Sequence, residues 1–445
     1  MYPNLYFVFN DWFGWKINVF KIFYTFGIFV ALAFIVSAWF LTRELKRKEK
    51  QGLLLPREET ITTGAPASLL SLFVNGFVGF IFGYKLVGAF IASRQTGLDL
   101  QEYIFSSQGS WLGGLILAAV LIYLKYKEKD KQKLAKPEKR TIRIWPHDRV
   151  GDIVIFALVF GIIGAKIFDN LENWDRFIQD PIANLIAPSG LTFYGGLICA
   201  AIAICIYARK KGIGLLYLID AAAPALMIAY AIGRMGCQTA GDGDWGIFNS
   251  AYVSDVPGHV VPATPEQFQQ KLREDSSYFL KGIVEDGPGV STMVTDRHEQ
   301  SLDKVPHKSF RGPKFLPTWM FAFTYPHNVN EDGILLRDCQ GKYCRALPQP
   351  VFPTPFYEIV ACFILFIILW LIRKRIHVPG VLFCVYLIMN GIERFLVETI
   401  RVNTTYSIFG IHPTQAELIS ATLVIVGIIG IIYFKQKDRL VGNTI

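Results

Sequence analysis

The chain has 445 residues, of which 52% are hydrophobic and only 18% are charged, and its mean hydropathy is +0.34. This composition excludes an ordinary soluble globular protein, because several apolar runs are long enough to cross a bilayer, which takes about 20 residues. The formal net charge is +9. The basic residues cluster directly after apolar segments, so they indicate membrane topology and no nucleic-acid partner.

Taken in chain order, the apolar stretches predict an all-α polytopic membrane protein with about nine transmembrane helices. The predicted spans are 17–41, 68–91, 109–126, 150–168, 191–208, 213–232, 356–372, 380–396 and 417–434. Because every basic run falls on the same side, we expect the N-terminus outside and the C-terminus in the cytoplasm. No small-residue cleavage site flanks the first span, so no cleavable signal peptide is expected.

Composition divides the chain into five segments. Residues 1–66 hold the first span and a cytoplasmic linker, 67–149 an added helix pair with a basic cytoplasmic loop, 150–246 the core spans, 247–352 an extracytoplasmic head insert, and 353–445 the last three spans. The insert is rich in Gly, Pro and aromatic residues, which predicts a small folded head with little regular structure beyond a helix capped by Thr264. For Cys339 and Cys344, an oxidising compartment favours a disulfide over two free thiols.

The stretch GRMGCQTAGDGDWG, residues 233–246, follows the sixth span and is the centre of the predicted site. Its glycines let the backbone approach a ligand closely. Arg234 lies at the edge of the hydrocarbon, where an arginine is costly unless it is paired, and its planar fork of donors suits a phosphate. The alternative is an ordinary helix exit built from turn residues.

Further polar residues fall near the outer ends of other spans. The eighth span ends in NGIERFLVETIR, where the polar residues spaced four, four and three apart are Asn390, Arg394, Glu398 and Arg401. This spacing places them on one helical face, which favours the wall of a polar cavity over a solvated stripe. Lys166, Glu358 and the Tyr194-Gly195-Gly196 stretch lie at similar depth. Asp220 lies in mid-span, and a structural hydrogen bond is as consistent with it as a functional role.

Together these cations and carboxylates predict a site for a ligand with an anionic head and apolar tails, such as a phospholipid. Other chemistries lack their motifs, because the sequence has no HExxH, no GxSxG, no Walker A loop and no GxGxxG before a helix. The aspartates of GDGDWG lack the EF-hand spacing, and all histidines fall outside the apolar spans, so no metal site is predicted.

These motifs resemble the bacterial prolipoprotein diacylglyceryl transferase family. The resemblance lies in FYTFGIFVALAFIVSAWFLTRE, GAKIF with SGLTFYGGLI, IDAAAPALMIAYAIGRMGCQTAGDGDWG, PTPFYE, GIERFLVETIR and PTQAELIS, in the family's order. It implies transfer of the diacylglyceryl group of phosphatidylglycerol to the lipobox cysteine of a preprolipoprotein, with formation of a thioether and release of glycerol phosphate. It implies no cofactor, and as partners phosphatidylglycerol, preprolipoprotein signal peptides and membrane lipid. The implied location is the bacterial cytoplasmic (inner) membrane, with the site facing the extracytoplasmic side.

Position by position, the resemblance also implies roles for single residues. The implied catalytic residues are Arg234, Arg394, Glu398 and Tyr194. The implied substrate-binding residues are Tyr24, Lys166, Gly195, Gly196, Asp242, Asp244, Trp245, Gly246 and Glu358, and the spacing on the eighth span adds Asn390 and Arg401. The chain departs from the family pattern where Tyr194 replaces a histidine and Cys237 an asparagine. The signature also has one extra residue, so either Asp242 or Asp244 can supply its acidic group.

Two functions from other classes stay open beside this one. A secondary transporter for an anionic solute also needs intramembrane arginines and carboxylates, although it would show internal repeats and a site at the midplane. A non-enzymatic envelope assembly protein would use the head as a docking module. An assay for diacylglyceryl transfer separates all three.

Overall fold

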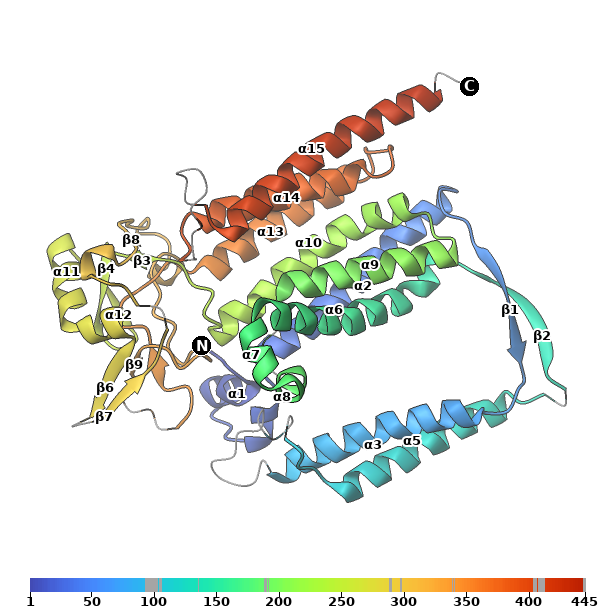
Figure 1. Ribbon diagram of the computed structural model, residues 1–445, viewed down its shortest axis with the longest axis horizontal. Helices are drawn as coiled ribbons and strands as arrows, with labels where there is room; N and C mark the ends of the chain where they lie inside the picture. Colours follow the sequence, from blue (N-terminus) through green and yellow to red (C-terminus); the bar gives the residue numbers. More distant parts are fainter. Residues whose placement is uncertain are drawn as a thin grey trace. The chain divides into compact units, whose positions relative to one another are not determined.

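The computed structural model describes residues 1–92, 103, 106–134, 136–187, 190, 192–287, 290–296, 298–337, 339, 341–402, 406 and 413–442. It is mostly helical (Figure 1). Within these described residues, seven helices are long and apolar enough to cross a membrane, as a polytopic membrane protein requires. They are α2 (Thr25–Lys50), α3 (Leu69–Ala92), α6 (Val150–Glu172), α9 (Phe193–Lys211), α10 (Leu215–Ala240), α13 (Thr354–Ile372) and α15 (Gln415–Gly442).

The other two predicted spans are helices as well, α5 (Trp111–Lys131) and α14 (Val381–Glu398). Neither contains an 18-residue stretch with two or fewer charged residues, whereas each of the seven does. Helix α5 ends in the sequence KEKDK, and α14 carries Glu393, Arg394 and Glu398 in its last two turns. A charged side chain inside hydrocarbon is costly, so apolarity alone does not identify these two helices as spans. The count of nine therefore stays a prediction.

The first span begins later than predicted, at Thr25 and not at residue 17, and runs on through RELKRKEK to Lys50. The cause is the N-terminal segment, which folds back on this point. The amide of Leu5 donates to the carbonyl of Phe23 (2.9 Å), and that of Thr25 donates to Pro3 (3.1 Å). These bonds use the backbone groups that a helix continuing from residue 17 would need. Residues 5–13 form a separate short helix, α1 (Leu5–Phe13).

The sixth span is longer than predicted, because α10 continues to Ala240 and makes residues 233–240 helical. It ends at Gly241, whose φ of +69° favours glycine. Asp220 lies in this helix, one turn before the helical Pro224. Its carboxylate accepts the amides of Gly380 (2.8 Å) and Phe383 (2.9 Å) and so caps the N-terminus of α14. Of the two interpretations of Asp220, a structural hydrogen bond and a functional role, the structure therefore supports the structural hydrogen bond.

The insert contains more regular structure than predicted. Its elements are β3 (Phe248–Asn249), β4 (Tyr252–Val256), β5 (His259–Pro262), α11 (Pro265–Glu274), α12 (Ser276–Lys281), β6 (Ile283–Gly287), β7 (Val290–Met293), β8 (His307–Lys308), β9 (Ile334–Leu335) and β10 (Arg345–Ala346). Helix α11 has the expected capping box between Thr264 and Gln267. Phe268, Leu272 and Phe279 belong to a buried apolar cluster. The insert is a head with its own core, at the ends of α10, α13 and α14 (Figure 1).

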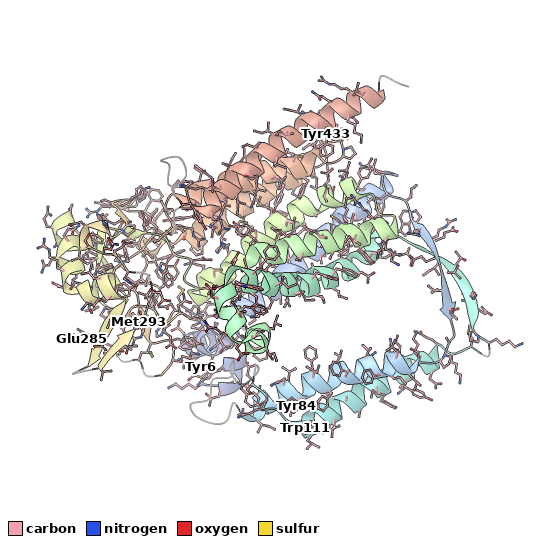
Figure 2. The ribbon with its side chains drawn as sticks, viewed as in Figure 1. Tyr6, Tyr84, Trp111, Glu285, Met293 and Tyr433 are labelled. Atoms are coloured by element: carbon pink, nitrogen blue, oxygen red, sulfur yellow. A yellow bond between two sulfur atoms is a disulfide. The ribbon has the colours of Figure 1, made fainter. Side chains whose placement is uncertain are left out.

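Two further strands lie outside the head. β1 (Arg57–Thr63) and β2 (Glu138–Ile144) pair antiparallel before α3 and after α5, in a ribbon that the all-α prediction missed. Helices α3 and α5 pack closely, because a Cβ on Gly83 would lie 2.2 Å from the carbonyl oxygen of Gly113. The rings of Tyr84 and Trp111 meet across this pair, 5.4 Å apart (Figure 2).

The remaining short helices are η1 (Asn18–Ile22), η2 (Pro146–Arg149), α7 (Trp174–Gln179), α8 (Pro181–Ile186), η3 (Leu302–Lys304) and η4 (Thr318–Met320).

The chain forms two compact units. The first comprises Met1–Gly14, Phe23–Ser37 and Ile219–Ile445, and the second comprises Trp15–Ile22 and Ala38–Leu218. The signature stretch, the head and α13–α15 belong to the first unit, whereas α3, α5, α6 and α9 belong to the second.

Candidate active site

Three arginines meet three carboxylates within the first unit. Arg234 comes from the last turns of α10 and Arg394 from the end of α14. Arg401 follows α14 directly. The carboxylates that they contact are Asp244, Glu358 and Glu398. We call these six residues the arginine cluster.

Glu358, in the first turns of α13, is the centre of the arginine cluster. Its side chain is fully buried, and its Oε2 lies 2.9 Å from Nε of Arg234. Its Oε1 accepts hydrogen bonds from Oη of Tyr230 (3.0 Å) and Nη1 of Arg394 (3.1 Å). Nη1 of Arg401 lies 3.7 Å from the same oxygen. A buried carboxylate is tolerated only with such partners, so Glu358 holds α10, α13 and the end of α14 together.

Asp244 joins the other side of the arginine cluster. One of its oxygens contacts Nη1 of Arg234 and the other contacts Nη2 of Arg401. Its side chain is 30% exposed, against 17% for Arg234 and 10% for Arg401. Burial by itself would raise the pKa of Asp244, but the two guanidiniums hold that pKa below its ordinary value. Asp244 is therefore an ionised carboxylate that solvent reaches.

On α14, Arg394 pairs with Glu398 one turn later, with Nη2 and Oε2 3.0 Å apart. Glu398 is fully buried, so this pair fixes the guanidinium from one side while Glu358 holds it from the other. Asn390 lies one turn before Arg394 and is half-buried. Among the described residues, its side chain makes no hydrogen bond to the arginine cluster.

The backbone brings Arg401 to the signature loop. The amide of Gly246 donates to the carbonyl of Phe352 (2.8 Å), and that of Ile247 donates to Ile400 (2.9 Å). A Cβ on Gly246 would lie 2.6 Å from the carbonyl oxygen of Ile400, so the close approach of these segments requires glycine. The chain after α14 thus runs beside the signature loop and places Arg401 against its acidic group.

Asp242 lies in the same loop. Burial raises its pKa to about 6, and the neighbouring charge of Asp244 acts in the same direction. Its protonation state consequently changes close to neutral pH. Cys237, in the last turn of α10, is buried, and its Sγ lies 3.8 Å from Nη1 of Arg234.

Sequence reasoning missed two members of this region, Tyr230 and Glu393. Tyr230 precedes Arg234 by one helical turn, a spacing that puts both on one face, and its ring lies 5.4 Å from the guanidinium carbon. Glu393 is only 5% exposed, and neither carboxyl oxygen has a hydrogen-bond partner among the described residues. The available signals were a tyrosine four residues before the signature arginine and a second carboxylate in GIERFLVE.

Two other predicted site residues of the first unit lie elsewhere. The ring of Trp245 packs on that of Tyr325, with centroids 5.2 Å apart, in a buried cluster with Leu347 and Val351. Its indole therefore belongs to an apolar core that it shares with residues of the head. Tyr24 is half-buried, and its backbone forms an antiparallel bridge with Asn4.

The remaining predicted residues lie in the second unit. Lys166 of α6 donates to the carbonyl of Gly190 (3.4 Å). Tyr194 is half-buried at the start of α9. A Cβ on Gly195 would lie 2.3 Å from Cβ of Phe168, and one on Gly196 would lie 2.8 Å from the carbonyl oxygen of Gly161. The two glycines thus allow α9 to pack on α6. A contact of these second-unit residues with substrate stays a prediction.

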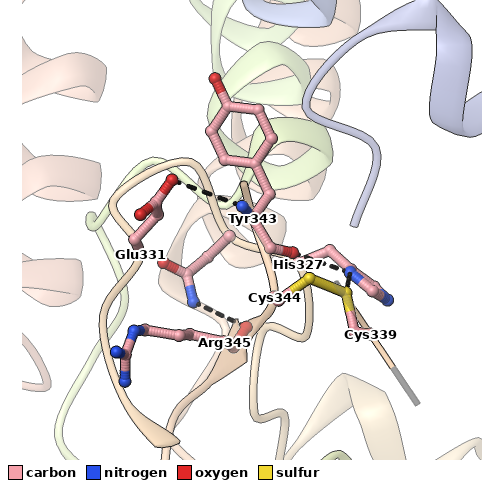
Figure 3. The surroundings of a disulfide bond; sticks show 7 residues. His327, Glu331, Cys339, Tyr343, Cys344 and Arg345 are labelled. Carbon is pink, nitrogen blue, oxygen red and sulfur yellow. Dashed lines mark hydrogen bonds between the residues drawn. A yellow bond between two sulfur atoms is a disulfide. The ribbon is translucent and has the colours of Figure 1, made fainter. Parts of the chain in front are cut away.

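In the head, Cys339 and Cys344 form a disulfide, with Cα atoms 5.5 Å apart (Figure 3). Between them, the amide of Tyr343 donates to Glu331 (3.4 Å), and its carbonyl accepts from Nδ1 of His327 (2.8 Å). Burial lowers the pKa of His327. Among the described residues, no group of three or more His, Cys, Asp or Glu side chains is placed to hold a metal ion.

The fold and the arginine cluster define a polytopic membrane protein with paired guanidiniums at the ends of its helices. The family model described as prolipoprotein diacylglyceryl transferase matches residues 110–433, and the chain therefore belongs to this family. Among its relatives are three proteins named phosphatidylglycerol–prolipoprotein diacylglyceryl transferase. That of Shouchella clausii is 24% identical over 321 residues, 72% of this chain and 83% of the relative. Those of Streptococcus agalactiae and Clostridium novyi are 24% and 26% identical over 74% and 76% of this chain, and 91% and 95% of the relatives.

Proposed function

We propose that this protein transfers the diacylglyceryl group of phosphatidylglycerol to the lipobox cysteine of preprolipoproteins, the first step of lipoprotein maturation. The observation that carries the proposal is the arginine cluster, in a chain of this family. Arginine forks bind phosphate oxygens with defined geometry. Neither a transporter nor an assembly protein is favoured by any contact described above.

The charges of the arginine cluster suggest how the lipid phosphate binds. Glu358 and Glu398 are fully buried and hold the guanidiniums from the inside. Asp244 is the exposed partner and bridges Arg234 and Arg401. A phosphodiester that enters from outside competes with Asp244 for these two donors, so the Asp244 carboxylate marks the place of the phosphate.

The chemical step needs no nucleophile from the enzyme, because the substrate cysteine supplies it. Its sulfur forms a bond to the carbon of the diacylglyceryl group that carries the phosphate, while the bond from that carbon to the phosphate oxygen breaks. Glycerol phosphate leaves with the electron pair, and Arg234 and Arg394 stabilise the charge that develops on it. The thiol proton goes to a carboxylate, and Asp242, with a pKa of about 6, is suited to accept it.

The other residues that the sequence placed in the site have supporting roles in this proposal. Tyr194 orients the lipid through its hydroxyl and its ring. Lys166, Tyr24 and Asn390 add further lipid contacts, whereas Gly195 and Gly196 act through the packing of α9 on α6. Tyr194→Phe should lower the rate measurably but far less than loss of an arginine.

For topology we propose nine spans in the bacterial cytoplasmic membrane, with the N-terminus and the arginine cluster outside and the C-terminus inside. Cysteines introduced near Asn184 and Asn330 should react with a membrane-impermeant reagent in intact cells. Cysteines near Lys133 and Lys374 should react only after lysis. Labelling of the Lys133 position from outside contradicts the nine-span arrangement.

The test of activity uses the purified protein in lipid nanodiscs with a synthetic lipobox peptide. Mass spectrometry should detect a diacylglyceryl adduct on the peptide cysteine when phosphatidylglycerol is present. A peptide with serine in place of that cysteine should remain unmodified. The cysteine peptide should also remain unmodified when the nanodiscs contain phosphatidylcholine alone. If folded protein forms no adduct in the presence of phosphatidylglycerol, the proposed function is rejected.

A further inference from the structure

The head contains a loop, residues 310–321, whose base is closed by a single buried side chain. Asn249 is fully buried, and its Nδ2 donates to the carbonyls of Phe310 (2.8 Å) and Phe321 (3.0 Å). Its Oδ1 accepts from the amide of Phe310 (3.1 Å). The rings of Phe310 and Phe321 lie 5.6 Å apart. A surface segment with ends joined in this way is an Ω-loop.

The tip of this Ω-loop is stiff. Pro313 and Pro317 restrict the backbone on both sides of it. The amide of Leu316 donates to the carbonyl of Pro313 (3.0 Å), and that of Met320 donates to Pro317 (3.1 Å). The tip is therefore presented in one conformation, and contact with a partner costs little conformational entropy.

The chemistry of the tip is unusual for a surface in water. Phe315 is 84% exposed and Leu316 is 37% exposed, with Trp319 at 41% beside them. Residues 307–320 contain three cations, Lys308, Arg311 and Lys314, and no Asp or Glu. Exposed aromatic and aliphatic side chains next to cations are typical of segments that lie in the interface of a membrane with anionic lipid.

The contacts of the Ω-loop place it at the first turn of α13 and beside the residues that follow α14. The ring of Trp319 lies 4.9 Å from that of Phe356 in the first turn of α13. Oη of Tyr357 donates to the carbonyl of Met320 (2.8 Å). Glu358, the centre of the arginine cluster, is the next residue of the same turn. Just before the loop, Lys308 donates to the carbonyl of Thr399, after the end of α14 (3.3 Å).

We propose that this Ω-loop is an interfacial anchor, which inserts Phe315 and Leu316 into the membrane leaflet beside the arginine cluster. Lys314 then lies among anionic phospholipid head groups. A lipid surface is the occupant because the loop is fixed to the first turn of α13 and its charge is complementary to such head groups. The anchor fixes the head over the membrane and enriches anionic phospholipid, the class of the proposed donor, next to the site.

Photo-crosslinking of the full-length protein in nanodiscs tests the insertion directly. A benzoylphenylalanine at Phe315 is compared with one at Met293, which is 62% exposed on the β6–β7 hairpin of the head (Figure 2). We expect a phospholipid adduct at position 315 and none at 293. Equal adducts at both positions, or none at 315, overturn the proposal. Adducts to an added lipobox peptide in place of lipid would show a peptide-docking loop and also overturn it.

Transfer kinetics test whether the anchor enriches the lipid donor next to the site. This second test rests on the proposed function. The KM for phosphatidylglycerol is expressed as the mole fraction of this lipid in the nanodisc. The variant F315S/L316S should raise this apparent KM about fivefold and change kcat less than twofold. The matched variant V290S/M293S removes exposed apolar side chains from the hairpin and should leave both constants unchanged. Lys314→Gln should raise KM about twofold in low salt and not in high salt.

The two experiments fail in different ways. A lower kcat at constant KM would show that the loop only supports the head, and it contradicts the anchor. If the wild-type protein transfers nothing from any lipid, the proposed function fails, while the crosslinks still decide whether the Ω-loop inserts.

Discussion

The arginine cluster and the α6–α9 pair both hold membrane helices together, but by opposite means. At the arginine cluster, helices meet through buried ions, with Glu358 contacting Arg234 and Arg394. Between α6 and α9, they meet through missing side chains, because Gly195 and Gly196 bring the two backbones together. Glycine packing is the ordinary way to join helices in lipid, where apolar burial gives little driving force.

The difference separates structure from function. Close packing through glycine gives stability at low cost, whereas buried ions are expensive and are retained where a ligand needs them. We therefore assign the chemistry to the arginine cluster and the framework to α6–α9, although the sequence placed Gly195 and Gly196 in the site. Substitutions in the two regions should have different consequences.

The largest effect is expected at Arg234. Arg234→Lys keeps the charge but loses the fork that joins Asp244 and Glu358, so transfer should fall about 100-fold or more. Protein abundance and melting temperature should change much less than turnover. Both are measured on the same purified sample, by size-exclusion chromatography and the peptide transfer assay. Turnover at the wild-type level would remove Arg234 from the mechanism.

The second prediction concerns the framework. In Gly195→Val the new side chain collides with Phe168 and with the carbonyl of Gly164, so folding should be destabilised by about 1–3 kcal/mol. The yield of folded protein should fall several-fold, while the rate per folded molecule stays near normal. Gly161→Ala is the matched control, because a Cβ there has nothing within 4 Å. Loss of turnover at a normal yield of folded protein would instead place Gly195 in the site, and α6–α9 would then no longer differ in role from the arginine cluster.

Much of this division could be predicted from local patterns. The spacing of four put Arg394 and Glu398 on one face of a helix, and the structure joins them at 3.0 Å. The apolar runs predicted every long helix within the described residues, with the largest errors at the ends of the first, sixth and last spans. Local signals sufficed because each depends on residues within a few turns of one helix.

The rest depends on contacts between distant segments. No periodicity predicts that Glu358 receives three arginines, or that Arg401, beyond the end of α14, returns to Asp244. Trp245 was placed in the site because it matches the family's signature. The turn after Gly243 directs its ring into an apolar core with Tyr325, and a contact of Trp245 with substrate stays a prediction. The glycine pair of α9 allows two interpretations, since close approach of a helix and of a ligand both require glycine. Its contact with substrate stays a prediction, which the Gly195→Val variant tests.

The third prediction concerns pH and Asp242. Its pKa in the folded protein is about 6, above the ordinary value of about 3.9, so transfer should decline as the pH falls through 6 and the carboxylate becomes neutral. Ionising it in the folded protein costs free energy, so Asp242→Asn should be more stable than wild type at pH 8. That advantage should shrink between pH 6 and 4, where wild-type Asp242 is protonated.

Thermal unfolding and transfer rates between pH 5 and 8 measure both effects. Asp242→Asn should be slower than wild type at pH 8 and should lose the decline near pH 6. If the wild-type rate is flat over this range and the variant keeps full activity, another group accepts the proton.

The smallest effect is expected at Cys237, which lies inside the arginine cluster region and nevertheless belongs to the packing. It is buried, with Sγ 3.8 Å from Arg234, and the reacting thiol comes from the substrate. Cys237→Ser keeps a small polar group at this point, so turnover should stay within about threefold of wild type, and no lipid should remain attached to the enzyme. Intact-mass spectrometry of wild-type protein, taken during turnover, checks for such an adduct. A dead serine variant together with a diacylglyceryl adduct on Cys237 would establish a covalent route, and Arg234 would then serve to activate an enzyme thiol as well as to bind phosphate.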